Sequence, residues 1–322
     1  VQKVSNDTYL KVFDTNLLEN KMKPSDQNNL TSEIKLSLNH ENFDFISGMQ
    51  VFEDLSSGNS DRYQYILPYY DFNKNFDVDF FNGQLNFASS GSNDLNNTNI
   101  LKTRVINDLE YKSNEVILDQ GIVSNFNIYF KNLATLGKND STYKSSPQIE
   151  LMNAYEFTSS YPLSKITEDN TNTLVPKVSF RFNPSDMKNY SSSSKSITVD
   201  NIFNINRLGL SDSFEKGKSL TVGLDYKKEN LNDINKFFEF KLASSFRDKE
   251  ENFIPNSTSL NKKNSNLFGS ITSAINENIS LKNEFRIDNN YDKFEYNSIN
   301  SKLKYNNFKT EFNFVEENGE TG

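Results

Sequence analysis

The sequence of 322 residues contains no cysteine, one histidine, and no apolar run long enough for a membrane-spanning helix. Without cysteine there is no disulfide, no thiolate nucleophile and no cysteine-ligated zinc. A spanning helix needs about 18 to 20 consecutive apolar residues, so a helical membrane protein is excluded. Basic residues are outnumbered 35 to 43 by acidic ones, and the net charge of -8 argues against a nucleic-acid partner.

Aromatic residues are abundant, by contrast, with 27 Phe and 15 Tyr in a chain that is only 35% hydrophobic. Disordered chains are poor in these residues, so the chain is expected to fold. Apolar residues recur with a period of two, which is typical of strands with one apolar and one polar face. The pattern is clearest in residues 76–80, 126–130, 178–182, 220–226, 238–242, 281–287 and 308–314.

Clusters of Asn, Asp, Ser and Gly separate these segments, as expected for turns and loops between strands. Two all-β folds fit: a soluble sandwich and a transmembrane β-barrel. Tyrosines at 63, 65, 69 and 70, around one strand, favour the barrel, because aromatic side chains gather at membrane interfaces. We therefore predict an all-β, antiparallel transmembrane β-barrel of the outer-membrane type, with residues 1–322 forming a partial barrel of about 13–16 strands within one domain of a longer protein.

Gly217, Lys218 and Ser219 look like the end of a phosphate-binding P-loop. That motif needs a glycine separated by four residues from the Gly-Lys pair, and a helix after it. Asp212 occupies the position of that glycine, and an alternating strand pattern follows the pair. The segment is therefore interpreted as a turn that leads into a strand.

Other isolated features have simple structural interpretations. His40 could serve a serine hydrolase, but no nucleophile stands out among the many serines, so a turn histidine is favoured. Asp77 and Asp79 share a strand face without forming a calcium signature. Pro68 and Pro176 lie within strand-like runs, where proline marks a strand start or a bulge. We predict no cofactor, no metal site and no enzymatic activity.

Several stretches, in order along the chain, resemble the barrel domain of the LptD (OstA, Imp) family of outer-membrane lipopolysaccharide-assembly proteins. They are SNDTYLKVFD at 5–14, FISGMQVFEDLSSGNSDRYQYILPYYDF at 45–72, YPL at 161–163, LVPKVSFRFNPSDMKN at 174–189 and RLGLSDSFEKGKSLTVGLDY at 207–226. The positions that match family motifs are Glu53, Leu55, Tyr65, Leu67 and Pro68, and then Arg207, Asp212, Glu215, Gly217, Gly223 and Tyr226. The chain departs from the family at Ser213 and Lys218, where arginine is usual.

The resemblance implies translocation of lipopolysaccharide and its insertion into the outer leaflet of the outer membrane of a Gram-negative bacterium. It implies lipopolysaccharide, outer-membrane lipids, an LptE-like plug lipoprotein and periplasmic lipopolysaccharide-bridge proteins as partners, with no nucleic acid. The lateral gate is expected outside this segment. Two other functions fit the residue pattern: a porin-like channel or receptor barrel, and a secreted β-sandwich adhesin.

Overall fold

A computed structural model describes residues 1–13, 23–24, 27–58, 62–78, 82–317 and 320–321 as an almost entirely β protein. These residues form 17 antiparallel strands, and all but β6, β9 and β17 have nine or more residues. The strands are β1 (Asn29–His40), β2 (Phe43–Asp54), β3 (Tyr63–Val78), β4 (Gly83–Asn96), β5 (Ile100–Ser113), β6 (Val116–Ile117), β7 (Val123–Lys138), β8 (Gln148–Ser160), β9 (Leu163–Ile166), β10 (Asn170–Asn183), β11 (Gly217–Asn230), β12 (Phe237–Arg247), β13 (Leu267–Asn276), β14 (Ile279–Ile287), β15 (Phe294–Tyr305), β16 (Phe308–Glu317) and β17 (Glu320–Thr321). The 14 longer strands agree with the expected 13–16, and each is long enough to cross a bilayer.

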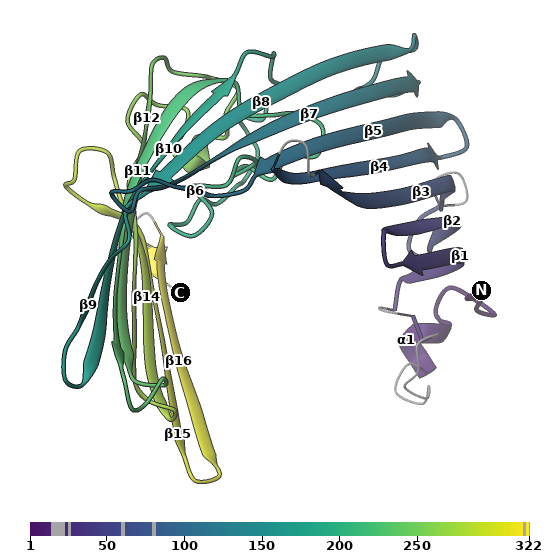
Figure 1. Cartoon of the computed structure of the whole chain (residues 1–322). Helices are drawn as coiled ribbons and strands as arrows, with labels where there is room; N and C mark the ends of the chain where they lie inside the picture. Colours follow the sequence, from purple (N-terminus) through teal and green to yellow (C-terminus); the bar gives the residue numbers. More distant parts are fainter. Residues whose placement is uncertain (14–22, 25–26, 59–61, 79–81, 318–319, 322) are drawn as a thin grey trace. The chain divides into compact units, whose positions relative to one another are not determined.

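The chain divides into two compact units, residues 1–111 with 129–151 and residues 112–128 with 152–322. In the first unit, β1 pairs with β2, β2 with β3, and β3 with β4. In the second, β10 pairs with β8, β9 and β11, and each strand from β11 to β17 pairs with the next. Neighbours in sequence are thus neighbours in the sheet, as in barrels built from hairpins (Figure 1).

Polarity across the strands is the reverse of that in a soluble protein. On β8, β10 and β11 the apolar side chains face solvent, with Phe157 50%, Phe180 45% and Leu220 41% exposed. The alternating polar positions are covered, and Arg181 between Phe180 and Phe182 is only 3% exposed. The predicted alternation is therefore confirmed, and these apolar faces do not pack into a shared dry core.

The connections in the second unit differ in length at the two ends of the strands. At one end, residues 167–169, 231–236 and 277–278 make short turns; at the other, residues 184–216 and 248–266 make long loops. We call these the short-turn end and the long-loop end. Barrels of the outer membrane have short periplasmic turns and longer extracellular loops.

Residues 5–13, the described part of the first stretch of resemblance, contain no strand. Part of this segment forms the short helix α1 (Tyr9–Phe13), which lies next to β1 and β2 (Figure 1). Leu10 of the helix is buried with Leu30 and Leu55. Arg62 holds the segment by ion pairs to Asp7 (2.6 Å) and to a β2 carboxylate (2.7 Å).

Both prolines of the strand-like runs lie at irregularities, as expected. At Pro68 the register of β3 shifts against β2 and β4. Pro176 of β10 lies opposite the gap between β8 and β9, where Tyr161 donates its backbone N–H to the Pro176 carbonyl (3.0 Å). Proline cannot donate to the ladder, which explains why the pairing strand is interrupted there.

Of the two aspartates considered for calcium, Asp79 lies outside the described residues.

Candidate functional site

The loop of residues 184–216, which we call the long loop, is fastened to the polar face of β10, β11 and β12. Arg207 of the loop donates from Nη1 to Thr221 Oγ1 (3.0 Å) and Ser245 Oγ (3.1 Å), and from Nη2 to Ser219 Oγ (3.1 Å). These hydroxyls project from β11 and β12 because they occupy the polar positions of the alternation. A single loop side chain therefore bridges two neighbouring strands.

Glu215, one residue from the end of the loop, is the centre of a buried cluster of charges. Arg207 binds its carboxylate with two hydrogen bonds, from Nη2 to Oε1 (2.6 Å) and from Nε to Oε2 (2.7 Å). Arg247 of β12 also donates to Oε1, and Arg181 of β10 lies 3.8 Å from Oε2. Arg181 further donates to the backbone carbonyls of Ile205 and Glu215, both at 2.8 Å. All four charged side chains are at most 8% exposed.

The electrostatics of the cluster favour an ionised Glu215. Burial alone raises the pKa of its carboxyl, but the guanidinium groups of Arg207, Arg181 and Arg247 outweigh burial and hold the pKa well below the ordinary value of 4.5. An arginine always remains charged, so removing the carboxylate would leave three buried cations without the only anion that contacts all of them among the described residues, with Glu156 interacting with Arg181 and Arg207 from farther away. The cluster therefore depends chiefly on Glu215.

A second contact fastens the middle of the long loop. The ring of Phe203 lies against Gly223 of β11, where an added Cβ would be 2.6 Å from the ring and 2.9 Å from the Leu242 carbonyl oxygen. The ammonium group of Lys177 lies 4.4 Å from the same ring and 2.7 Å from Asp225 Oδ2. Glycine is therefore required at 223 because the loop approaches the strand closely.

The long loop also shares an apolar cluster with the second long connection, residues 248–266. The cluster comprises Met187, Ile197, Val199, Ile202, Leu208, Leu210, Ala243, Ile254, Leu260 and Phe268, of which eight belong to the two loops and Ala243 and Phe268 to strands. Backbone hydrogen bonds join the loops as well, from Tyr190 N to Phe253 O (2.8 Å) and from Asn256 N to Ser191 O (3.2 Å). The two loops thus form one packed body on the polar face of the sheet.

Comparison with known protein families shows which family the chain belongs to. The model of the LptD family, LPS transport system D, matches residues 1–317. The chain belongs to the LptD family. A comparison with curated proteins found no match.

Membership confirms the resemblance found in the sequence and, at the level of the family, a role in lipopolysaccharide transport and outer-membrane assembly. The antiparallel strands, with their apolar faces outermost, are those of a partial outer-membrane β-barrel. The LptD family is an outer-membrane family of Gram-negative bacteria and not a family of enzymes. No helix in the described part of the chain is long and apolar enough to span a membrane. Within the same residues, no group of three or more His, Asp or Glu side chains is placed to hold a metal ion.

The family-motif residues of the second unit, except Tyr226, gather around the long loop. Arg207 and Glu215 form the buried ion pair, and Gly223 is the residue against which the Phe203 ring packs. Asp212 pairs with Lys188 Nζ (3.2 Å) and accepts a hydrogen bond from the Tyr190 hydroxyl.

Two further motif residues mark β11 itself. Gly217 begins the strand at a φ of +92°, a conformation that favours glycine, and lies against the Arg247 guanidinium. A strand follows it, so the segment is the end of a long loop and lacks the helix of a P-loop. Tyr226 is set apart from the cluster, because its side chain lies on the opposite face of β11, where its hydroxyl donates to Asn172 Oδ1 (3.0 Å).

The motif residues Tyr65, Leu67 and Pro68 belong to β3 of the first unit. Tyr65 stacks with Tyr63 at a ring-centroid distance of 6.1 Å, and Leu67 is 40% exposed beside the register shift at Pro68. Their surroundings are those of an irregular strand. A functional role for them stays a prediction.

Sequence reasoning missed Arg181, Arg247 and Phe203 as parts of the site. Arg181 and Arg247 occupy polar positions of their strands, so the alternation indicates the face on which they lie. It cannot indicate that both converge on Glu215, because that depends on how residues 184–216 fold back. Arg181 and Arg247 supply two of the three positive charges around Glu215.

Proposed function

We propose that this chain forms part of the wall of the outer-membrane barrel that passes lipopolysaccharide into the outer leaflet, and that the long loop is a fixed barrier on the inner side of that wall. The exposed apolar faces would contact lipid, and the polar faces would line the interior. The single observation that carries the proposal is the buried Glu215 cluster, which joins the loop to three adjacent strands.

The strand faces support the membrane placement. Exposing Phe and Leu side chains to water costs free energy, whereas the same side chains in contact with lipid hydrocarbon carry no such cost. The Arg and Glu side chains would be very costly against lipid, and here they lie on the covered face. Lipid outside and a polar interior satisfy both sets of residues.

The cluster also argues against the porin-like alternative. A porin needs charges of opposite sign that face each other across open water, so that they act on a passing solute. Here Arg207 and Glu215 form an ion pair with each other and are only 5% and 2% exposed. Their charges therefore offset each other within the protein and do not act on a passing solute. They hold the loop in place and do not line an open constriction.

The proposed partners follow from this placement. Lipopolysaccharide would reach the polar interior from periplasmic bridge proteins, and an LptE-like lipoprotein would fill the part of the interior left free by the loops. Residues 1–322 would belong to a single barrel domain. The lateral gate is not assigned to any residue of this chain.

The experiment is complementation in cells depleted of the full-length protein. Arg207→Met and Glu215→Gln variants should reach the outer membrane but admit an antibiotic too large for porins, and should reduce the arrival of new lipopolysaccharide at the cell surface. Glu229→Gln is the matched control, because Glu229 of β11 pairs with Lys227 at a partly exposed site outside the cluster. Normal permeability and normal lipopolysaccharide delivery in both loop variants, with protein levels unchanged, would refute the barrier role.

A further inference from the structure

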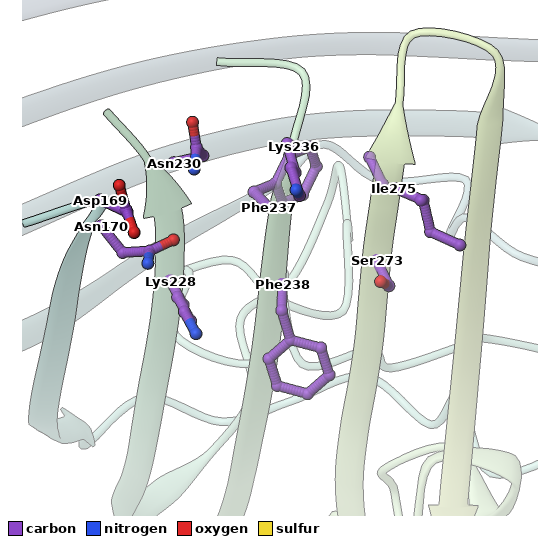
Figure 2. Close-up of a pocket in the computed structure, with 10 residues that line it drawn as sticks. Asp169, Asn170, Lys228, Asn230, Lys236, Phe237, Phe238, Ser273 and Ile275 are labelled. Carbon is purple, nitrogen blue, oxygen red and sulfur yellow. The ribbon is translucent and has the colours of Figure 1, made fainter. Parts of the chain in front are cut away.

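A groove of about 590 Å³ lies at the short-turn end of β10, β11, β12 and β13, away from the long loop. Figure 2 shows Lys228 on one strand beside the ring of Phe238 on the next, with Asn170 and Asp169 to one side and Lys236 at the nearby turn. None of the family-motif residues lines it.

The register of the strands places this groove on the apolar face, at the border of the apolar band. Three rows of paired residues describe the change. Moving toward the short-turn end they read Pro176, Leu224, Leu242 and Gly269; then Leu174, Tyr226, Phe240 and Ile271; then Asn172, Lys228, Phe238 and Ser273. The first two rows contain no charged or amide side chain, and the third introduces both an ammonium and an amide.

The height of the apolar band agrees with a bilayer border at this third row. On β10, the apolar positions run from Leu174 to Phe182, eight steps along the strand, or roughly 27 Å of extended strand. The apolar band of outer-membrane barrels is about 25 Å tall and is flanked by aromatic girdles. Tyr226 and Phe238, whose rings lie 6.3 Å apart, occupy the girdle position. Lys228 is therefore at the level of lipid headgroups.

The charged groups of the groove are free to act on a ligand. Lys228 and Lys236 are exposed, and neither forms an ion pair with a carboxylate among the residues that the structure describes. Lys227, the neighbour on the opposite face, is by contrast paired with Glu229 at 2.7 Å. Asp169 is the one acidic side chain in the lining.

We propose that this groove binds the headgroup of a glycerophospholipid from the leaflet at the short-turn end. The two ammonium groups would hold the phosphate, the amides of Asn170 and Asn230 would donate to its ester oxygens, and Phe238 and Ile275 would contact the first methylenes of the acyl chains. Asp169 lies where an amine on the headgroup would be paired, which favours phosphatidylethanolamine over phosphatidylglycerol. This inference rests on the proposed membrane placement of the apolar faces.

The test uses the full-length protein in nanodiscs, followed by native mass spectrometry of the lipids that stay bound. Lys228→Gln with Lys236→Gln should weaken retention of phosphatidylethanolamine, by about fivefold for each ammonium group removed. Lys218→Gln is the matched control, because Lys218 lies on the same face of the same strand at the long-loop end and should leave retention unchanged. Asp169→Asn should reduce the preference for phosphatidylethanolamine over phosphatidylglycerol.

Three results would overturn the proposal: equal retention by the double variant and the wild type, displacement of the lipid by excess inorganic phosphate, or selective loss of lipopolysaccharide with phospholipid retained. The first result in a protein that enters nanodiscs normally removes the headgroup site and leaves the membrane placement intact. Failure of the wild-type protein to enter nanodiscs at all would instead remove the proposed function.

Discussion

The polar faces of the two units are built in different ways. In the second unit the polar face of β10–β12 carries arginines and is covered by a packed loop that ends in Glu215. In the first unit, polar positions of β3 and β4 carry amides, such as half-buried Asn86, which donates to the exposed Asn73 (2.9 Å) and Asn75 (2.7 Å). A wall that must stay wet needs only solvated amides, whereas a wall that holds a loop needs charges strong enough to order it. Under the proposed barrier role, the covered polar face of the second unit is the part of this chain that would narrow the passage.

The largest effect is expected from Glu215→Gln. The substitution leaves Arg181, Arg207 and Arg247 buried without their anion, which should lower the local stability of residues 184–216 by about 3–5 kcal/mol. Hydrogen exchange of the loop amides in the full-length protein measures this free energy. Protection factors that match the wild type would contradict the anchoring role.

Gly223→Val tests the second fastening point of the same loop. The new side chain would occupy the space of the Phe203 ring and press on the Leu242 carbonyl, with an expected cost of about 1–3 kcal/mol. The strand itself should tolerate valine, since the residue favours β structure. Faster proteolysis within residues 184–216, with normal heat-modifiable migration of the barrel, is the expected result. The double variant Gly223→Val with Phe203→Ala should recover part of the protection.

The substitution Asp108→Asn removes a charge from an ion pair in the first unit, for comparison with Glu215→Gln in the second. Asp108 pairs with Lys131 Nζ at 2.6 Å, and its own side chain is 20% exposed. The substitution takes the carboxylate from a single buried ammonium, and the carboxylate itself is partly solvated, so about 1–3 kcal/mol is expected, less than for Glu215. The effect should be confined to exchange in β5 and β7. A loss equal to that of Glu215→Gln would remove the contrast between the two units.

Much of this fold can be predicted from the period-two pattern alone, whereas the residues of the candidate site cannot be predicted from it. Phe180 and Arg181 are assigned to opposite faces by simple alternation, because a strand has only two faces. The meeting of Arg207 and Glu215 with Arg247 joins residues up to 40 positions apart, and it depends on a loop whose path no periodicity describes. Glycine at 223 was noticed through resemblance to the family, but the reason for it, the Phe203 ring, is visible only in the packed loop. The helix at Tyr9–Phe13 was likewise missed, since five residues are too few for a helical period.

Of the changes considered, a change of pH within the ordinary range is expected to have the smallest effect on the stability of the long loop, because Glu215 does not titrate there. Its folded pKa lies below the unfolded value of 4.5, so its contribution to stability is complete above pH 4.5 and is lost as the pH falls toward the folded pKa. The loop should therefore be equally rigid at pH 7 and pH 5, and below pH 4.5 its stability should fall by about 1.4 kcal/mol per pH unit. A spin label at the exposed Ser211 reports this mobility in the full-length protein. Glu215→Gln should be mobile at every pH, so a wild-type transition near pH 6, or one that persists in this variant, would show that another group controls the loop.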